Sequence, residues 1–132
     1  FIFTSCAGPC PKLTKRMAEI QHRARNMGDA VRLVTFSVDP ENDTPEVLAK
    51  YAKTYRANPR KWTFLTGPVG DVEALAIKGF KEATGRESLF AIGHSEHLFL
   101  IDPNGQIRGF YEATDEGVTA LLHDMGILAN VP

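Results

Sequence analysis

The sequence predicts an α/β domain, a three-layer sandwich in which a central mixed sheet carries helices on both faces. Two patterns support this fold class. Early in the chain, strand-like runs rich in β-branched residues alternate with runs in which apolar residues recur every three or four positions. Such alternation is typical of parallel strands joined by crossover helices. Later, two strand-like runs flank a Pro-Asn-Gly turn, which predicts an antiparallel hairpin.

The expected elements follow this alternation. Strands are expected at residues 1–3, 31–38, 62–66, 97–101 and 106–111, and helices at about 11–27, from 44, 69–83 and 115–125. We expect Gly28 and Gly126 to end the first and last helices, and Asp43 or Thr44 to cap the second.

Side chains on the apolar sides of these elements are expected in the core. They include Val47, Leu48, Tyr51, Leu75, Val118, Leu121 and most aromatic residues, Phe110 among them. Phe90 is the exception, because it lies in a loop expected over residues 85–93 and could flank a site there.

The order of elements is thioredoxin-like, with one helix and one strand inserted in the middle. In that fold the first helix starts beside the strand that precedes it, here at a pair of cysteines. All 132 residues are expected to form a single domain, long enough to bury a core without disulfides. Phe1-Ile2-Phe3 resembles the inside of a buried strand, so we expect the chain to be a fragment whose leading strands are absent.

Composition excludes several classes of protein. The net charge is −1 and no basic stripe appears, which argues against nucleic acid as a partner. No apolar run approaches the roughly 20 residues that cross a bilayer. Two cysteines are too few for a disulfide scaffold.

The two cysteines form a Cys6-x-x-x-Cys10-Pro11 motif between a strand and a helix. The unpaired N–H groups of a helix N-terminus favour an anion, which lowers the pKa of a thiol there. Such a pair can exchange disulfides, bind a soft metal or form a structural disulfide. Gly8 and the flanking prolines shape a turn that an inert pair would not require, which favours a functional role.

A histidine is the natural third ligand for a metal held by two thiolates. Of the four histidines, His22 and His123 are expected to lie on helices, the first exposed and the second far along the chain from the cysteines. We favour His94 over His97, because the loop that enters the hairpin lies beside the cysteine turn in a thioredoxin-like fold. Two thiolates and one imidazole suit Cu(I). Zinc would require a fourth ligand, for which Asp39 and His97 are candidates.

Asp39 has two interpretations. It either lies close to the cysteine sulfurs, since its strand should end on the same side of the sheet, or simply forms a turn before the next helix.

Four segments together resemble the Sco/SenC family of copper-delivery proteins. They are Phe1-Ile2-Phe3-Thr4-x-Cys6-x-x-x-Cys10-Pro11, Val38-Asp39-Pro40-x-x-Asp43-Thr44-Pro45-Glu46, Leu65-Thr66-Gly67, and His94-Ser95 ahead of Leu100-Ile101-Asp102-Pro103-x-Gly105. The resemblance implies a thioredoxin-like domain with a copper site formed by Cys6, Cys10 and His94.

The resemblance also implies a role and a location. The copper, Cu(I) and also Cu(II), would be delivered to the binuclear copper centre of cytochrome c oxidase, or to another copper protein. The parent protein would be anchored at the periplasmic face of a bacterial membrane or in the mitochondrial intermembrane space, with the anchor absent from this chain.

Some family members act instead as thiol–disulfide reductants, in which case Cys6 and Cys10 would be a catalytic redox pair. The three-residue spacer, and the lack of proline between Arg86 and Asp102, argue against an efficient reductase. A peroxidase is disfavoured because Phe3 stands three residues before Cys6, where such sites have Thr or Ser. A metal-free redox sensor or interaction module is a further alternative.

Overall fold

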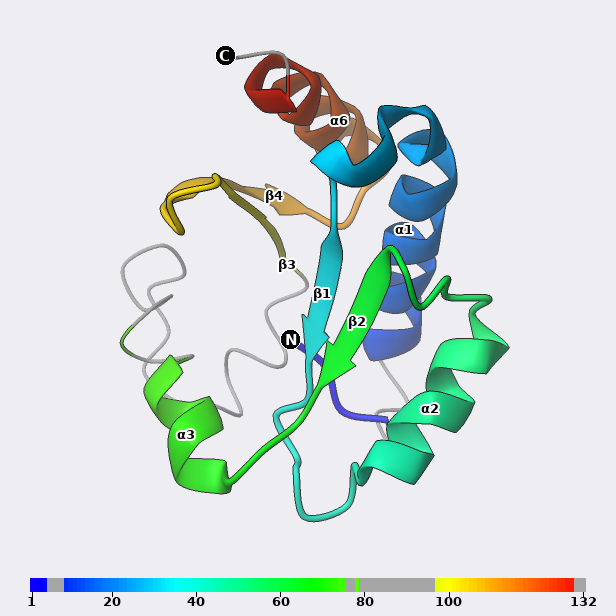
Figure 1. The fold of residues 1–132 in the computed structure, drawn as a ribbon, viewed down its shortest axis with the longest axis vertical. Coiled ribbons are helices and arrows are strands. Elements are labelled where there is room, and N and C mark those ends of the chain that lie inside the picture. The colour runs from blue at the N-terminus through cyan, green and yellow to red at the C-terminus, as the bar shows by residue number, and fades with distance from the viewer. Residues whose placement is uncertain (5–8, 76–77, 79–96, 130–132) are drawn as a thin grey trace.

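A computed structural model describes residues 1–4, 9–75, 78 and 97–129 (Figure 1). The side chains of Pro9, Cys10 and Val69 are outside this description. The predicted loop at 85–93, with Phe90, and the second half of the helix predicted at 69–83 also lie outside the described residues.

Helices and strands alternate in the predicted order. The elements are α1 (Pro9–Arg23), η1 (Arg25–Ala30), β1 (Leu33–Phe36), α2 (Pro45–Thr54), β2 (Trp62–Leu65), α3 (Val69–Ala74), β3 (His97–Ile101), β4 (Ile107–Glu112) and α6 (Asp115–Ala129). The prediction of one continuous helix over 11–27 was wrong at its C-terminal end. There α1 ends at Arg23 and a 3₁₀ segment follows, in which Gly28 adopts φ +58°. Gly28 therefore does mark the turn out of the helical region.

The strands form a parallel pair and an antiparallel hairpin. β1 pairs in parallel with β2, from Leu33 opposite Trp62 to Phe36 opposite Leu65. β3 pairs with β4 from His97 opposite Glu112, and Gly105 with φ +80° turns the chain between them. The mixed parallel and antiparallel arrangement agrees with the predicted α/β class.

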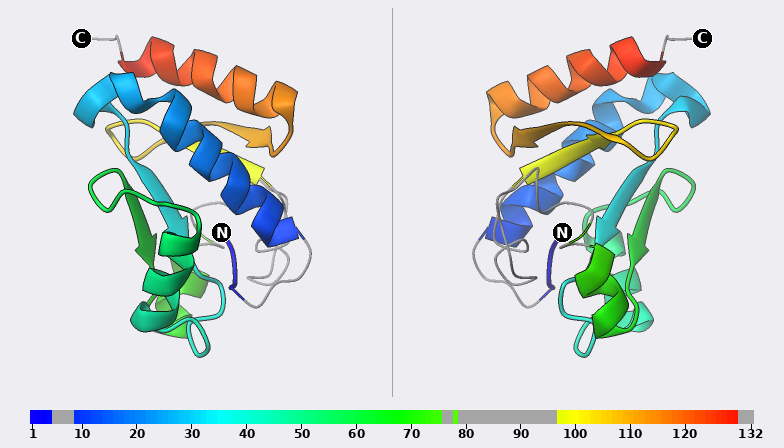
Figure 2. Two further views of the ribbon diagram at one scale, coloured as in Figure 1. Left: turned by 90° about the vertical axis from the view of Figure 1, so that its right-hand side faces the viewer. Right: turned by 90° about the vertical axis from the view of Figure 1, so that its left-hand side faces the viewer.

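The N-terminal segment lies between these two pairs. Ile2 bridges Ser37 in parallel, donating its N–H to Phe36 O at 2.9 Å and accepting the N–H of Val38 at 2.8 Å. The ring of Phe1 stacks on Phe36 at 5.5 Å and meets Phe99 of β3 edge-on at 6.2 Å. The segment thus follows β1 and touches β3, and β3 runs roughly opposite to β1 (Figures 1 and 2).

The main core lies between α1, α6 and the strands. Helices α1 and α6 lie side by side against the strands (Figure 2). Apolar side chains from nearly every described element contribute, including Ile2, Leu13, Ile20, Leu33, Trp62, Leu98, Val118, Leu121 and Met125. Trp62, only 2% exposed, also donates its indole N–H to the Thr35 hydroxyl at 2.9 Å.

Several predictions of burial and of helix ends were wrong. Val47, Leu75 and Phe110 are exposed, although Leu48, Val118 and Leu121 are buried as predicted. Gly126 does not end the last helix, because α6 continues to Ala129 and brings Leu128 against the core. The packing of this last turn offsets the cost of about 1 kcal/mol for a glycine inside a helix.

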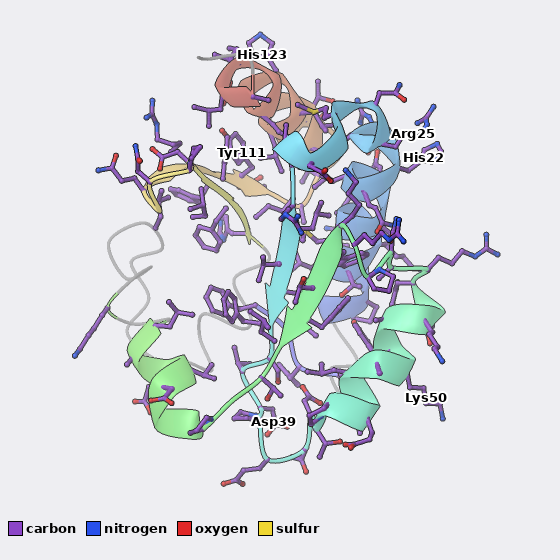
Figure 3. The ribbon with its side chains drawn as sticks, in the orientation of Figure 1. His22, Arg25, Asp39, Lys50, Tyr111 and His123 are labelled. Atoms are coloured by element: carbon purple, nitrogen blue, oxygen red, sulfur yellow. The ribbon has the colours of Figure 1, made fainter. Side chains whose placement is uncertain are left out.

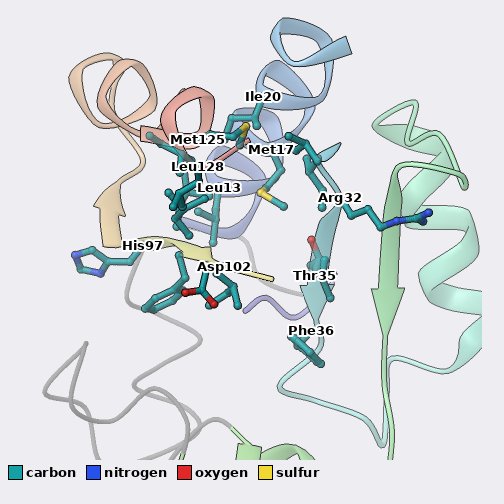
Figure 4. A pocket seen from close by; sticks show the side chains of 18 of the residues that line it. Leu13, Met17, Ile20, Arg32, Thr35, Phe36, His97, Asp102, Met125 and Leu128 are labelled. Atoms are coloured by element: carbon teal, nitrogen blue, oxygen red, sulfur yellow. The ribbon is translucent and has the colours of Figure 1, made fainter. Parts of the chain in front are cut away.

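An apolar cavity of about 700 Å³ separates β1 from β3 (Figure 4). Its walls are mostly aliphatic and sulfur-containing side chains, with Leu13, Met17 and Ile20 from α1 and Met125 and Leu128 from α6. Arg32 and Asp102 also contribute to its lining. This lining does not resemble a metal site, for which several convergent ligand groups are required.

Candidate metal centre

The predicted ligands fall at the limits of the described structure. Cys6 and His94 lie outside the described residues, and Cys10 is described only as the second residue of α1. The ligand set Cys6, Cys10 and His94 therefore stays a prediction. The described residues do establish how the chain approaches each of these positions.

The approaches to Cys6 and His94 are neighbours in space. Phe1 lies five residues before Cys6, and Phe99 lies five residues after His94. The rings of Phe1 and Phe99 are in contact at 6.2 Å. Because the N-terminal segment runs along β1 and β3 runs against it, the chain leaves toward Cys6 and arrives from His94 on the same side of this contact.

His97 begins β3 at the rim of the apolar cavity. Its half-buried ring points away from the cavity (Figure 4) and meets Phe110 edge-on at 5.2 Å. Its Nδ1 atom is buried and has no hydrogen-bond partner. His22 and His123 are exposed on α1 and α6, where the sequence predicted them.

Asp39 forms a turn before α2, as one of its two interpretations predicted. Its carboxylate accepts a hydrogen bond from the Asn42 amide at 2.9 Å, and its carbonyl accepts the N–H of Asp43 at 2.9 Å. Its own N–H donates to the Ser37 hydroxyl at 3.0 Å. Asp39 lies beyond the C-terminal end of β1, far from His22 and Arg25 (Figure 3). Within the described ranges, no three His, Cys, Asp or Glu side chains gather to hold a metal.

Asp43 is a residue whose role the sequence did not reveal. Of the two predicted caps of α2, Asp43 and Thr44, the structure has Thr44, whose hydroxyl accepts the N–H of Val47 at 3.3 Å. Asp43 is instead completely buried and binds Thr4, two residues before Cys6. An Asp-Thr-Pro-Glu sequence is typical of a helix start, so nothing local distinguishes this carboxylate from an ordinary cap.

Three of the described groups with shifted pKa values belong to the hairpin and α6. Burial and the Asp124 carboxylate raise the pKa of Tyr111 to about 12, and the Tyr111 hydroxyl lowers the pKa of Asp124. In the hairpin turn, the N–H of Gln106 lowers the pKa of Asp102, whose carboxylate also accepts the N–H of Asn104. Both carboxylates are satisfied by neighbouring donors, which is typical of a structural role.

Comparison with known proteins decides the family. The family model described as SCO1/SenC matches residues 1–126, nearly the whole chain. The chain belongs to the SCO1/SenC family. A SCO1 protein homolog of Bacillus subtilis is 35% identical over 117 residues, which are 87% of this chain and 61% of that protein.

Two further relatives carry informative names. A Stutzerimonas stutzeri protein whose name provisionally assigns it copper binding is 31% identical over 86% of this chain and 56% of its own length. The solved structure of BsSco, described as having a disulfide switch and as a member of the Sco family of cytochrome c oxidase assembly proteins, is 29% identical. It superposes with a TM-score of 0.79, covering 100% of this chain and 78% of that one.

These matches confirm the predicted α/β, thioredoxin-like class of this SCO1/SenC chain. The chain spans between 56% and 61% of the two curated relatives. None of the helices built from described residues has the length and apolar character of a membrane span.

Proposed function

We propose that this SCO1/SenC domain binds one copper ion through Cys6, Cys10 and His94 and passes it to a copper-accepting protein. The observation that carries the proposal is the contact between Phe1 and Phe99, which joins the chain segment leading to Cys6 with the segment following His94. Cys10 is the second residue of α1. Three ligands of two types, from two segments distant in the sequence, would thereby be available to one ion.

The ligand chemistry favours Cu(I) as the cargo. Two thiolates are soft donors and an imidazole completes a three-coordinate site. Both thiols release their protons when they bind metal, so copper affinity should rise with pH until the thiols are ionised. Transfer then requires only ligand exchange, in which donor groups of the acceptor replace Cys6, Cys10 and His94 in turn.

Membership in the SCO1/SenC family supports the proposals for recipient and location. A copper-accepting subunit of cytochrome c oxidase is the proposed partner, with another copper protein as the broader class. We propose the periplasmic face of a bacterial membrane or the mitochondrial intermembrane space as the site of action. There, the domain would belong to a longer anchored parent with additional leading strands.

The test is copper stoichiometry under reducing conditions. The parent chain should bind one Cu(I), and Cys6→Ser, Cys10→Ser and His94→Ala should each abolish tight binding. His97→Ala is the matched control, because His97 is three residues away and its ring packs on Phe110. Equal copper affinity in His94→Ala and the parent would disprove the ligand set. If His97→Ala loses copper binding and His94→Ala retains it, His97 and not His94 would be the third ligand.

A thiol–disulfide reductase is the second candidate, favoured by the disulfide switch ascribed to BsSco. A thiolate of the pair would attack a target disulfide, release one target thiolate and form a mixed disulfide. The second thiol would then displace the other target thiolate, so the target gains two electrons and Cys6 and Cys10 become a disulfide. Rapid insulin reduction that persists in His94→Ala would favour this reaction over copper transfer.

A further inference from the structure

Asp43 provides a buried link between the loop before α2 and the chain that leads to Cys6. Its side chain is completely buried. The carboxylate accepts the backbone N–H of Thr4 at 3.1 Å and the Ser37 hydroxyl at 2.7 Å, and it also accepts the Thr4 hydroxyl. No lysine, arginine or histidine among the described residues pairs with it.

Such a carboxylate holds its partners firmly. A buried charge that loses its donors has a high desolvation cost, and hydrogen bonds to an ionised acceptor are stronger than neutral ones. Thr4 lies two residues before Cys6. The chain at Thr4, ahead of Cys6, is therefore tied to the segment that opens α2.

The other side of the turn has a matching link. Thr14, 1% exposed, lies one helical turn after Cys10 in α1. Its hydroxyl is hydrogen-bonded to the Tyr51 hydroxyl of α2 at 2.8 Å. Since Asp43 immediately precedes the Thr44 cap and Tyr51 lies within the same helix, both links end on one rigid element.

We propose that Asp43 and Tyr51 are positioning residues that fix the spacing of Cys6 and Cys10 by tying both sides of their turn to α2. This inference rests on one part of the proposed function, namely that the thiols of Cys6 and Cys10 act as a pair. Two sulfurs bind one ion, or close a disulfide, only within a narrow range of separations. Loosening either link should weaken the pairing of the thiols more than it weakens the fold.

The test compares link variants with structural controls. Asp43→Asn removes the charge and leaves one acceptor oxygen in place of two, which weakens the hydrogen bonds to Thr4 and Ser37, and Tyr51→Phe removes only the hydroxyl. Asp102→Asn is the first control, because Asp102 is also a buried acid that accepts backbone N–H groups, at the hairpin turn. Tyr111→Phe is the second, because it removes a hydroxyl bonded to Asp124 at 2.6 Å.

Three quantities are measured for each variant: the dithiol–disulfide equilibrium against glutathione, Cu(I) affinity against a competing chelator, and the melting temperature. We expect each link variant to lower the disulfide-forming equilibrium constant about tenfold, roughly 30 mV for two electrons. Copper affinity should fall by a similar factor. The controls should lower the melting temperature while leaving the equilibrium and the affinity unchanged.

Thr4 supplies a rescue experiment. Thr4→Val removes the hydroxyl that binds Asp43, and Thr4→Ser retains it. The valine variant should shift the dithiol equilibrium in the direction of Asp43→Asn, and the serine variant should restore it. If Asp43→Asn does not fold, Tyr51→Phe and the two Thr4 variants still test the positioning role.

The outcomes separate the two proposals. A shift of the dithiol equilibrium in the link variants, in a protein that binds no copper, would support the positioning role and refute the copper function. Link variants that lose only melting temperature, or controls that shift the equilibrium equally, would overturn the positioning role. Tight Cu(I) binding unchanged in both link variants would also overturn it, without affecting the copper proposal.

Discussion

An engineered strand placed ahead of Phe1 should stabilise this domain by filling the cavity between β1 and β3. Backbone groups of a strand alternate in direction. The N–H of Leu33 donates to Lys61 O, just before β2, and that of Ser37 to Leu65 O of β2, so the N–H groups of Arg32 and Val34 face away from β2. A segment that continues the pairing of Ile2 would therefore meet the backbone groups of β1 that face away from β2.

The magnitude follows from the register. Two added residues on the core face, the first and third ahead of Phe1, would contact Leu13, Met17 and Leu33 around the 700 Å³ cavity. Burying two aliphatic side chains contributes about 5 kcal/mol, and four ladder hydrogen bonds about 4 kcal/mol. Ordering five residues costs about 7 kcal/mol. The net gain is about 2 kcal/mol, which corresponds to a rise of roughly 8 °C in melting temperature.

Thermal and urea unfolding would be followed by the fluorescence of Trp62, the single tryptophan, which is 2% exposed. The extension carries valine at the first and third positions ahead of Phe1 and threonine at the other three. The control exchanges the two residue types at the first four positions, which turns the valines to the opposite face. Equal melting temperatures for the two extensions, or no gain over the parent, would refute the proposed pairing.

Three further predictions concern single residues. Tyr111→Phe should lower the free energy of unfolding in urea by about 1 kcal/mol. Burial and Asp124 raise the pKa of Tyr111 to about 12. The stability that this hydroxyl contributes should therefore be complete below about pH 10 and decline between about pH 10 and 12. Trp62→Phe should cost about 2 kcal/mol by circular dichroism, since it leaves the Thr35 hydroxyl without its donor. Gly28→Ala should cost about 1–2 kcal/mol in the same assay, because φ is +58° although nothing lies within 4 Å of the added methyl group; an unchanged midpoint would contradict that strain.

Local patterns were sufficient for the order and type of most elements. The hairpin was predictable because Asp102 to Gly105 are turn-forming residues between two apolar runs, and the structure has the turn there. The length of α6 was not predictable in this way. Gly126 satisfies the local rule for a helix end, but the contact of Leu128 with the core is a tertiary effect that the rule does not contain.

The sequence alone suggests ligands for the candidate site but not the contacts that would support them. Cys6, Cys10 and His94 stay predicted ligands, chosen because few residue types bind copper and because the expected order of elements favours His94 among the histidines. The link from Asp43 to Thr4 spans 39 residues and involves a carboxylate that matches a helix cap in sequence. Its burial becomes apparent only when the N-terminal segment is paired with β1.

The copper carrier proposed above would have to satisfy two opposing requirements, which is why the support of the thiols matters to that proposal. The ion must leave by ligand exchange, so its ligands belong on an accessible turn, yet affinity requires the two thiols to be held at a fixed separation. Rigidity must then come from groups beneath the turn. In the proposed role, the hydrogen bonds of Asp43 and of Tyr51 would supply this rigidity, because both are buried or partly buried, Asp43 directly precedes the cap of α2, and Tyr51 lies within α2. The exposed ion pair between Arg16 and Asp115, at the start of α6, would be too weak and too strongly screened for such a role.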